Sequence, residues 1–493
     1  MYYHSTRNSE YKVTAAEAIS KGLAPDGGLF VPSEIPQIDK NYIAELCKKD
    51  YRGRAVSVMS KYLEGFEITE LEDYVSSAYA ENYDVPEIAP TRFVDNNTAV
   101  LELWHGPTCA FKDMALQILP HLLTASLKKC GENREVCILV ATSGDTGKAA
   151  LEGFADVPGT KILVFYPHNG VSEVQKLQMV TQSGANVGVA AVNGNFDDAQ
   201  TGVKKIFGDK EFAKLLSERG YFLSSANSIN WGRLLPQIVY YFSAYCDCVN
   251  AGNIKNGDAL DFVVPTGNFG DILACWYAKL MGLPVGKLLC ASNQNNVLSD
   301  FLQTGVYDRN RPFHTTISPS MDILVSSNLE RLLYSICKND KEVAGYMAAL
   351  NECGVYEVSD IIKSEIADNY IGGYCSDEET KDTIKCVYEE KSYLMDTHTA
   401  VAYKLLADYR KKTGIIAPAV VVSTASPFKF CGSVLEALGH SSEKSGTKII
   451  EELAEVSGCN APDPLKNLDK REIRFELVVD KEDMRNTVDS FLN

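Results

Sequence analysis

Short aliphatic runs alternate with helical patterns through the middle of the chain, and this alternation constrains the fold more than any other feature. Runs of strand length lie at 136–141, 162–166, 187–192, 222–226, 262–264, 288–291 and 420–423. Helical patterns begin after several of them, near Lys148, Ser172 and Asn230. Continuous apolar strands that alternate with helices are typical of a parallel sheet covered on both faces. In such α/β folds, ligands bind at the carboxyl ends of the strands.

The chain has 493 residues, which exceeds what one hydrophobic core usually holds, so we expect several domains. Between about 300 and 412 the aliphatic strand runs are missing, and helical, charged sequence replaces them. The predicted organisation is an N-terminal domain at 1–95, the first part of an α/β domain at 96–299, a mainly helical insertion at 300–412, and a return to the α/β domain with a C-terminal tail at 413–493.

The overall charge excludes some classes of partner. The formal net charge is −17 at pH 7, so the long-range field opposes binding to nucleic acids and to anionic membranes. No apolar run approaches the length of a membrane span, and the first residues lack the apolar core of a secretory signal. We therefore expect a cytoplasmic protein with a small-molecule ligand. Any phosphate group must be held by local amides and cations, because the global field repels anions.

The cysteines and histidines show no metal-binding pattern. The fourteen cysteines are scattered, the closest two being Cys246 and Cys248, and no Cys-x-x-Cys pair occurs. No two histidines have the spacing of metal ligands. We expect reduced, mostly buried thiols and no metal site.

The segment 105–113, His-Gly-Pro-Thr-Cys-Ala-Phe-Lys-Asp, places Lys112 next to Phe111 at the start of a predicted helix. A lysine at a helix start is usually an exposed surface residue. A deprotonated lysine amine, however, condenses with pyridoxal phosphate, which then acts as an electron sink. These residues alone leave both interpretations of Lys112 open, and the family resemblance described below favours the second, with Phe111 beside the cofactor.

Residues 265–271, Pro-Thr-Gly-Asn-Phe-Gly-Asp, join a predicted strand to a predicted helix. Glycines at such a turn let backbone N–H groups converge on an anion, and the helix that follows presents its positive end. We predict that this glycine loop binds a cofactor phosphate through Gly267, Asn268, Phe269, Gly270 and Asp271. An ordinary capping turn with Asp271 near the cap is the alternative.

Two further loops follow predicted strands and carry hydroxyl groups. Hydroxyls and N–H groups at the start of a helix suit a carboxylate ligand, and one such loop contains Thr142, Ser143, Asp145 and Thr146. The other begins at Thr424. A hydroxyl that faces a pyridine nitrogen keeps that nitrogen largely neutral. Simple turns at strand ends remain the alternative for both loops.

Together these segments resemble the threonine synthases, which use pyridoxal 5'-phosphate. The likeness also includes residues 3–7 and 22–29, and it spans nearly the whole chain. The length resembles that of the longer microbial and fungal members. The resemblance implies an α/β fold of type II, similar to the tryptophan synthase β subunit, with parallel sheets flanked by helices, an N-terminal domain and a helical insertion. It implies conversion of O-phospho-L-homoserine and water into L-threonine and phosphate, by a monomer or homodimer.

The resemblance also implies roles for individual residues. Lys112 would hold the cofactor and move protons, the glycine loop would bind the cofactor phosphate, and Thr424 would face the pyridine nitrogen. The loop at 142–146 would bind the substrate carboxylate. Its Asp145 stands where the β-type pyridoxal enzymes usually carry asparagine, although the long threonine synthases share this aspartate.

The start of the predicted helix near residue 230 gives a weaker signal. Ser228, Asn230 and Arg233 either contact a substrate phosphate, with Arg233 forming a bidentate contact, or are ordinary first-turn residues. Lys429 is a further possible anion partner. His398 is either an acid–base group or part of a helix cap.

Two other functions share most of these features. A pyridoxal-dependent phospholyase would use the same residues and release a keto acid instead of adding water. A non-catalytic ligand-binding relative usually loses the cofactor lysine or the phosphate loop, and both are present here.

Overall fold

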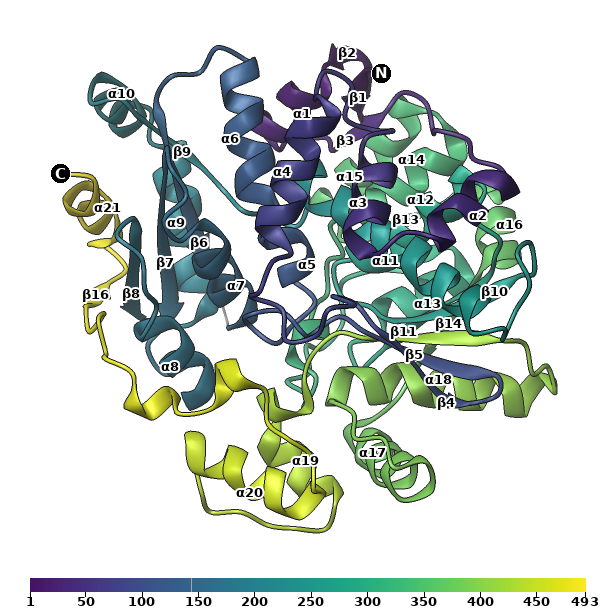
Figure 1. Cartoon of the computed structure of the whole chain (residues 1–493). Coiled ribbons are helices and arrows are strands. Elements are labelled where there is room, and N and C mark those ends of the chain that lie inside the picture. The colour runs from purple at the N-terminus through teal and green to yellow at the C-terminus, as the bar shows by residue number, and fades with distance from the viewer. Residues whose placement is uncertain (143) are drawn as a thin grey trace.

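The computed structural model describes residues 1–142 and 144–493. These residues form a larger and a smaller β-sheet, each covered by helices, with α5 between them (Figure 1). The predicted series of parallel strands is confirmed, but its members divide between the sheets. Strands at 136–141, 162–166, 187–192 and 222–226 belong to the smaller sheet, and the later strands belong to the larger one.

The N-terminal part carries a small antiparallel sheet of order β2-β1-β3 and several helices. Its elements are β1 (Tyr3–Ser5), β2 (Asn8–Val13), α1 (Ala15–Lys21), β3 (Phe30–Pro32), α2 (Lys40–Cys47), α3 (Tyr51–Met59) and α4 (Ile68–Ala78). Helix α1 begins at a capping box formed by Thr14 and Glu17 and ends at Gly22, whose φ of 68° suits glycine.

The larger sheet has the order β14-β11-β10-β15-β5-β4, with only β4 antiparallel among these strands. Its strands are β4 (Thr91–Asp95), β5 (Thr98–Glu102), β10 (Leu260–Pro265), β11 (Val285–Ser292), β14 (Tyr370–Tyr374) and β15 (Ala419–Ser423), and the helices packed around it include α11 (Trp231–Asn250), α12 (Gly270–Met281), α13 (Val297–Thr304) and α18 (Thr397–Thr413). Successive side chains along each strand point to opposite faces of the sheet. Val263 joins the core under α18, whereas Phe262 and Val264 join the core that contains α11 and α12.

The smaller sheet is parallel throughout and has the order β16-β8-β7-β6-β9. Its strands are β6 (Glu135–Ala141), β7 (Thr160–Pro167), β8 (Val187–Asn193), β9 (Tyr221–Ser224) and β16 (Val478–Asp480), and its helices include α7 (Asp145–Phe154), α8 (Glu173–Val180), α9 (Phe196–Gly208), α10 (Lys210–Glu218) and α21 (Met484–Leu492). Cys137 and Leu139 pack toward α9, α10 and α21, while Ile138 packs into the central core. The carboxyl ends of β5, β6, β10 and β15 carry the predicted site loops.

The range 300–412 is mainly helical, as the sequence predicts, and it also contains short strands. It contains β12 (Val306–Asp308), α14 (Leu329–Cys337), α15 (Asp340–Glu352), β13 (Val355–Glu357), α16 (Asp360–Asn369), β14, α17 (Asp377–Lys391) and α18. Strand β14 pairs in parallel with β11 in the larger sheet. A β-carbon on Gly372 would lie 2.8 Å from the carbonyl oxygen of Ser299. Glycine is therefore needed in this strand, and it removes the aliphatic signal that sequence patterns use.

The C-terminal tail connects the two sheets. After α19 (Cys431–Ala437) and α20 (Thr447–Ser457) the chain runs along the molecule to β16, at the edge of the smaller sheet (Figure 1). Strand β16 begins at Val478, and before it the N–H of Arg474 bonds to the carbonyl of Val180. None of the helices in the described residues combines the length and apolar character that crossing a membrane requires.

Candidate functional site: a lysine between two sheets

Lys112 lies at the N-terminal end of α5 (Asp113–Leu116), and the loop before it is held in a defined shape. The carboxylate of Asp113 accepts hydrogen bonds from the backbone N–H and the hydroxyl of Thr108, at 2.8 and 2.7 Å. The N–H of Phe111 donates to the carbonyl of Thr424 at 2.8 Å. The lysine loop is therefore fixed to the end of β15, which places Lys112 and Thr424 in one region, as predicted.

Charged side chains converge on Lys112. Burial lowers the pKa of its amine, the carboxylate of Asp145 opposes this change, and the cations of Lys429 and Arg233 lower the pKa further. A lowered pKa makes the deprotonated amine, which attacks an aldehyde, more available here than at an exposed lysine.

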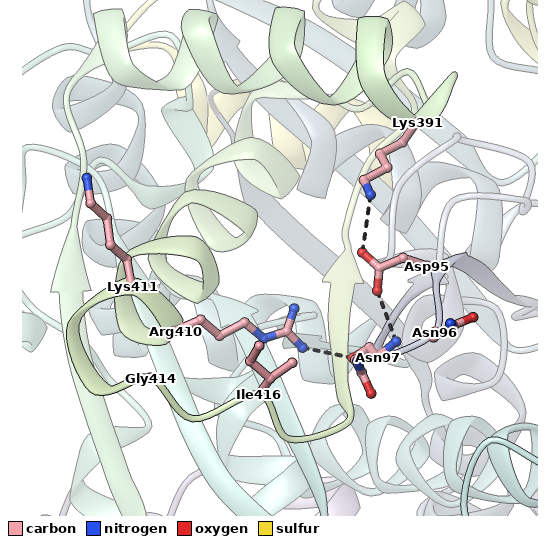
Figure 2. Close-up of a pocket in the computed structure, with 8 residues that line it drawn as sticks. All are labelled: Asp95, Asn96, Asn97, Lys391, Arg410, Lys411, Gly414 and Ile416. Carbon is pink, nitrogen blue, oxygen red and sulfur yellow. Dashed lines mark hydrogen bonds and ion pairs between the residues drawn. The ribbon is translucent and has the colours of Figure 1, made fainter.

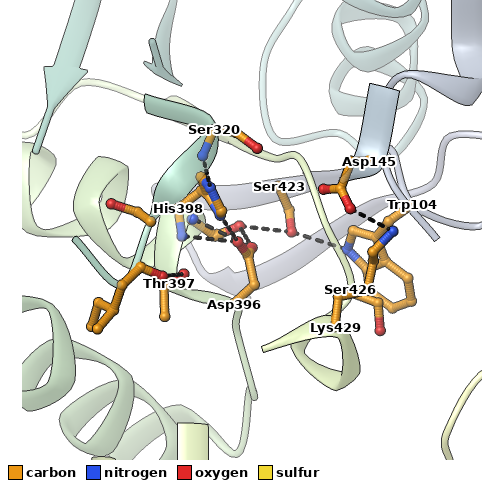
Figure 3. A network of polar contacts seen from close by, with 12 residues as sticks. Trp104, Asp145, Ser320, Asp396, Thr397, His398, Ser423, Ser426 and Lys429 are labelled. Atoms are coloured by element: carbon orange, nitrogen blue, oxygen red, sulfur yellow. Dashed lines mark hydrogen bonds and ion pairs between the residues drawn. The ribbon is translucent and has the colours of Figure 1, made fainter. Parts of the chain in front are cut away.

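Asp145 keeps its negative charge although it is buried. Its Oδ1 atom lies 2.8 Å from Nζ of Lys429 (Figure 3). The same oxygen accepts a hydrogen bond from Nε2 of Gln175 at 3.0 Å. Burial raises the pKa of Asp145, but the cations of Lys429 and Lys112 outweigh burial and hold the pKa well below its usual value. The ammonium group of Lys429 thus compensates the charge of the aspartate at this position.

The rest of the 142–146 loop is shaped by one hydroxyl. Oγ1 of Thr142 accepts hydrogen bonds from the N–H groups of Gly144 and Gly147, both at 3.0 Å. Thr142 therefore closes the turn that begins α7, and Thr146 lies in the first turn, partly exposed. Ser143 lies outside the described residues. Contacts of Thr142, Ser143 and Thr146 with a substrate stay a prediction.

The glycine loop joins β10 to α12, as predicted. Phe269 has a left-handed backbone with φ of 62°, and α12 begins at Gly270. Within the described part of the chain, the backbone N–H groups of residues 267–270 donate no hydrogen bond to a protein acceptor. A left-handed residue at a helix start makes successive N–H groups converge, so this loop fits a phosphate group.

The carboxylate of Asp271 bonds to other residues of the protein, and a contact of this residue with the cofactor phosphate stays a prediction. Its carboxylate accepts hydrogen bonds from the hydroxyl groups of Tyr240 and Tyr241 on α11. It does not cap α12, because the residue at the cap is Phe269 and no side chain bonds there. The side chain of Asp271 therefore links α12 to α11.

The three residues near the start of α11 have different surroundings. Asn230 caps the helix by accepting from the N–H of Gly232 at 2.8 Å, and its Nδ2 donates to the carbonyl of Ile19 at 2.9 Å. Both polar ends of the Asn230 side chain have partners within the protein, which agrees with its interpretation as an ordinary helix-start residue. Ser228 is only partly buried.

Arg233 is the stronger candidate for an anion. It is 4% exposed, and Nη1 donates to the carbonyl of Ala226 at 2.9 Å. Its buried Nε has no partner among the described residues, and burial lowers the pKa of the guanidinium to about 10. A buried donor without a partner fits an anionic ligand beside Lys112.

His105 and His398 are both held by carboxylates. His105 lies between Asp84, at 2.6 Å, and Glu102, at 3.0 Å, so it shapes the lysine loop. Nδ1 of His398 pairs with Asp396, the residue that caps α18, while its Nε2 accepts from the N–H of Ser320 (Figure 3).

Several members of this polar network were not in the predicted set. Oγ of Ser423 accepts hydrogen bonds from Nε1 of Trp104 and Oγ1 of Thr399, both at 3.0 Å. Ser320 comes from a segment far from either residue in sequence. No local motif signals such contacts, since only the tertiary fold brings these segments together.

A pocket elsewhere on the described surface is lined by residues that stabilise the larger sheet at the start of β5. It has a volume of about 550 Å³ and lies at the amino ends of β5 and β15, remote from the site loops (Figure 2). Its Arg410 donates to Oγ1 of Thr98 at 2.7 Å and to the carbonyl of Ala417 at 2.9 Å, and its Lys391 pairs with Asp95 at 3.6 Å. These cations thus hold the turn before β5.

The described residues contain no cluster of three His, Cys, Asp or Glu side chains arranged for a metal ion. They do contain an amine with a lowered pKa, a loop of converging N–H groups and a hydroxyl residue at the end of β15. This donor set fits the aldehyde, phosphate and pyridine nitrogen of pyridoxal phosphate.

Comparisons with known proteins agree with that fit. The family model "Pyridoxal-phosphate dependent enzyme" matches residues 98–426, "Threonine synthase N terminus" matches 2–79, and "Threonine synthase, C-terminal" matches 399–488. The chain is therefore built as a pyridoxal-phosphate-dependent enzyme of fold type II, with pyridoxal phosphate as its cofactor.

Similar proteins define the family more closely. Threonine synthase of Saccharomyces cerevisiae is 36% identical over 99% of this chain and 98% of its own length. The structure of pyridoxal-phosphate-bound threonine synthase from Brucella melitensis has a TM-score of 0.89 and 37% identity, covering 100% of this chain and 98% of that one. The chain belongs to the threonine synthase family.

Some relatives are longer. "Threonine synthase-like 1" of Macaca fascicularis is 41% identical over 88% of this chain, but the match spans only 59% of that protein. The chain thus corresponds to about three fifths of these relatives.

Proposed function

We propose that this protein is a threonine synthase, which eliminates phosphate from O-phospho-L-homoserine and adds water to give L-threonine. The observation that carries the proposal is the position of Lys112, a buried amine whose pKa is lowered by burial and by the nearby Arg233 guanidinium, of which the buried Nε has no partner among the described residues. A substrate with one amine and two anionic groups suits this surrounding. Family membership supports the same reaction.

The bound cofactor would supply an electron sink for the carbanion chemistry of the substrate. Lys112 would take a proton from the α carbon and return protons along the chain of the substrate, because its Nζ is a base when it is not bonded to the cofactor. The N–H groups of residues 267–270 would hold the cofactor phosphate, and Thr424 would face the pyridine nitrogen.

The substrate needs two anion sites. Arg233 would bind the phosphate that leaves, since its buried Nε is a donor without a partner in the described structure. The start of α7, with Thr142, Thr146 and the helix N–H groups, would bind the carboxylate. A cytoplasmic location and a monomeric or homodimeric state remain predictions.

The test combines a spectrum with product analysis. The purified protein should show the visible absorbance of lysine-bound pyridoxal phosphate, and Lys112→Ala should abolish it, while Lys128→Ala, on an exposed helix lysine, should retain it. With O-phospho-L-homoserine, threonine and phosphate should appear in equal amounts. Keto acid and ammonia would instead identify a phospholyase, and a protein that binds no cofactor would overturn both assignments.

Arg233 has its own test within this proposal. Arg233→Lys keeps the positive charge but loses the planar fork, so KM for O-phospho-L-homoserine should rise about tenfold, the value of one charged hydrogen bond. The cofactor absorbance should not change. An unchanged KM would remove Arg233 from the phosphate site.

A further inference from the structure

The side chain of Lys429 is fully buried and ends between two oxygen atoms from different parts of the fold. Its exposed fraction is 0%, and its Nζ lies 2.8 Å from Oδ1 of Asp145 and 2.9 Å from the carbonyl of Thr108, to which it donates. A buried ammonium group is unfavourable unless an anion compensates it. Asp145 supplies that anion, and its side chain is only 5% exposed.

Each end of this pair is fixed by a separate element. Lys429 closes the short 3-10 helix 427–429 that follows β15, whereas Asp145 lies in the first turn of α7 on the smaller sheet. Thr108, the other partner of Lys429, bonds Asp113 next to Lys112. The ion pair therefore joins the two sheets at the lysine loop.

Lys112 is close enough to respond to both charges. Asp145 raises the pKa of its amine, and Lys429 lowers it. The other charged groups that act on it are Arg233, which lowers the pKa, and Asp113, which raises it. Opposite effects of two paired groups cancel in large part when both are present.

We propose that Lys429 is a positioning residue whose ammonium group is matched to Asp145, so that the pair adds little net charge beside Lys112 and the bound cofactor. The proposal rests on the proposed function in that Lys112 carries the cofactor. It explains how a carboxylate occupies this position: without Lys429, Asp145 would place an uncompensated negative charge next to the lysine. Without Asp145, Lys429 would place an uncompensated positive charge there.

The experiment uses the holoenzyme and the variants Lys429→Met, Asp145→Asn and the double variant. The first readout is the midpoint of the pH titration of the visible absorbance of the cofactor joined to Lys112. The second is the pH dependence of acylation of Lys112 in the cofactor-free protein, followed by mass spectrometry. Both report the proton affinity of the same nitrogen without measuring turnover.

The two single variants should shift the midpoints in opposite directions. Lys429→Met leaves Asp145 alone and should raise the midpoint by about one pH unit or more, and Asp145→Asn should lower it by a similar amount. The double variant should return to within about half a unit of the parent protein. A residue with a purely structural role would give no such cancellation.

Shifts in the same direction, or a double variant that does not return, would overturn the proposal. If Lys429→Met does not fold, Asp145→Asn still decides, because an unchanged midpoint in that variant contradicts a matched pair. Failure of the proposed function looks different, since the parent protein would then lack the visible absorbance or form no threonine. If the parent protein has the visible absorbance and forms threonine, but every variant has the same midpoint, only the proposed charge matching of Lys429 and Asp145 is rejected.

Discussion

Nε2 of His398 accepts a hydrogen bond from the backbone N–H of Ser320 at 3.2 Å. An imidazole nitrogen that accepts carries no proton, so the ring is neutral and its proton is on Nδ1, which lies 2.9 Å from Oδ1 of Asp396. Ser320 in turn packs its carbonyl oxygen against Gly267 in the glycine loop. The start of α18 thus supports the predicted phosphate loop through one histidine.

Replacing His398 by leucine should weaken cofactor binding. The buried N–H of Ser320 would lose its acceptor, which costs about 1–3 kcal/mol, and the loop would lose part of its support. We expect the dissociation constant of pyridoxal phosphate, measured by absorbance titration, to rise roughly tenfold. His440→Leu at an exposed position is the matched control. Equal affinity in both variants would show that His398 does not support the loop.

Gly267→Ala should also reduce cofactor affinity, by a steric route. A β-carbon at this position would lie 2.7 Å from the carbonyl oxygen of Ser320, so the loop or its neighbour must move. Gly345→Ala adds the same methyl group in the middle of α15, where no atom lies within 4 Å. Affinity should fall only in the first variant. Full cofactor binding by Gly267→Ala would contradict the close approach that we describe.

His105 should make stability depend on pH. Burial lowers its pKa, but hydrogen bonds to Asp84 and Glu102 outweigh burial and raise it to about 9. The folded state therefore binds this proton more tightly than the unfolded state, whose value is about 6.5. The resulting stabilisation is complete below about pH 6.5 and is lost as the pH rises through about 9.

Melting temperatures can check this dependence. His105→Gln should lower the apparent Tm more at pH 6 than at pH 9.5, whereas His440→Gln should change it little at either pH. A deficit of the same size at both pH values would mean that the charge of His105 contributes nothing.

Asp271 should show the opposite behaviour. Burial raises its pKa to about 6, despite hydrogen bonds from Tyr240 and Tyr241. Its ionisation therefore opposes folding, and the loss of stability develops as the pH rises from about 4 through 6. The difference from the ordinary value of 3.8 corresponds to at most about 3 kcal/mol.

Asp271→Asn should remove this penalty. Asparagine still accepts from the tyrosine hydroxyls but stays neutral, so the apparent Tm should exceed that of the parent protein by a few degrees at pH 8. The gain should shrink at pH 5. Cofactor affinity should not change, because the side chain faces the tyrosines. A variant that loses the cofactor would instead place Asp271 at the phosphate site.

Sequence patterns predicted those helices and strands whose formation depends mainly on residues close together in the chain. The strand–loop–helix units with long aliphatic runs, such as β6 and β10, form where the sequence places them, because burial on both faces requires continuous apolar residues. Strand β14 escaped prediction because close contact with Ser299 requires glycine in it. The division of the strands between sheets is a matter of pairing over long separations, which no local pattern contains.

The sequence by itself predicted Lys112 as the reactive amine and the loops that accompany it, since a lysine before a helix and a glycine turn after a strand are local arrangements. Only the tertiary structure decided what surrounds that amine. Lys429 and Asp145 are far apart in the chain, and their charges compensate only because two sheets meet at the lysine loop. The same folding turns Asp271 toward the tyrosines of α11 and brings His398 to Ser320. Electrostatic effects depend on distance and burial, and these exist only in the folded protein.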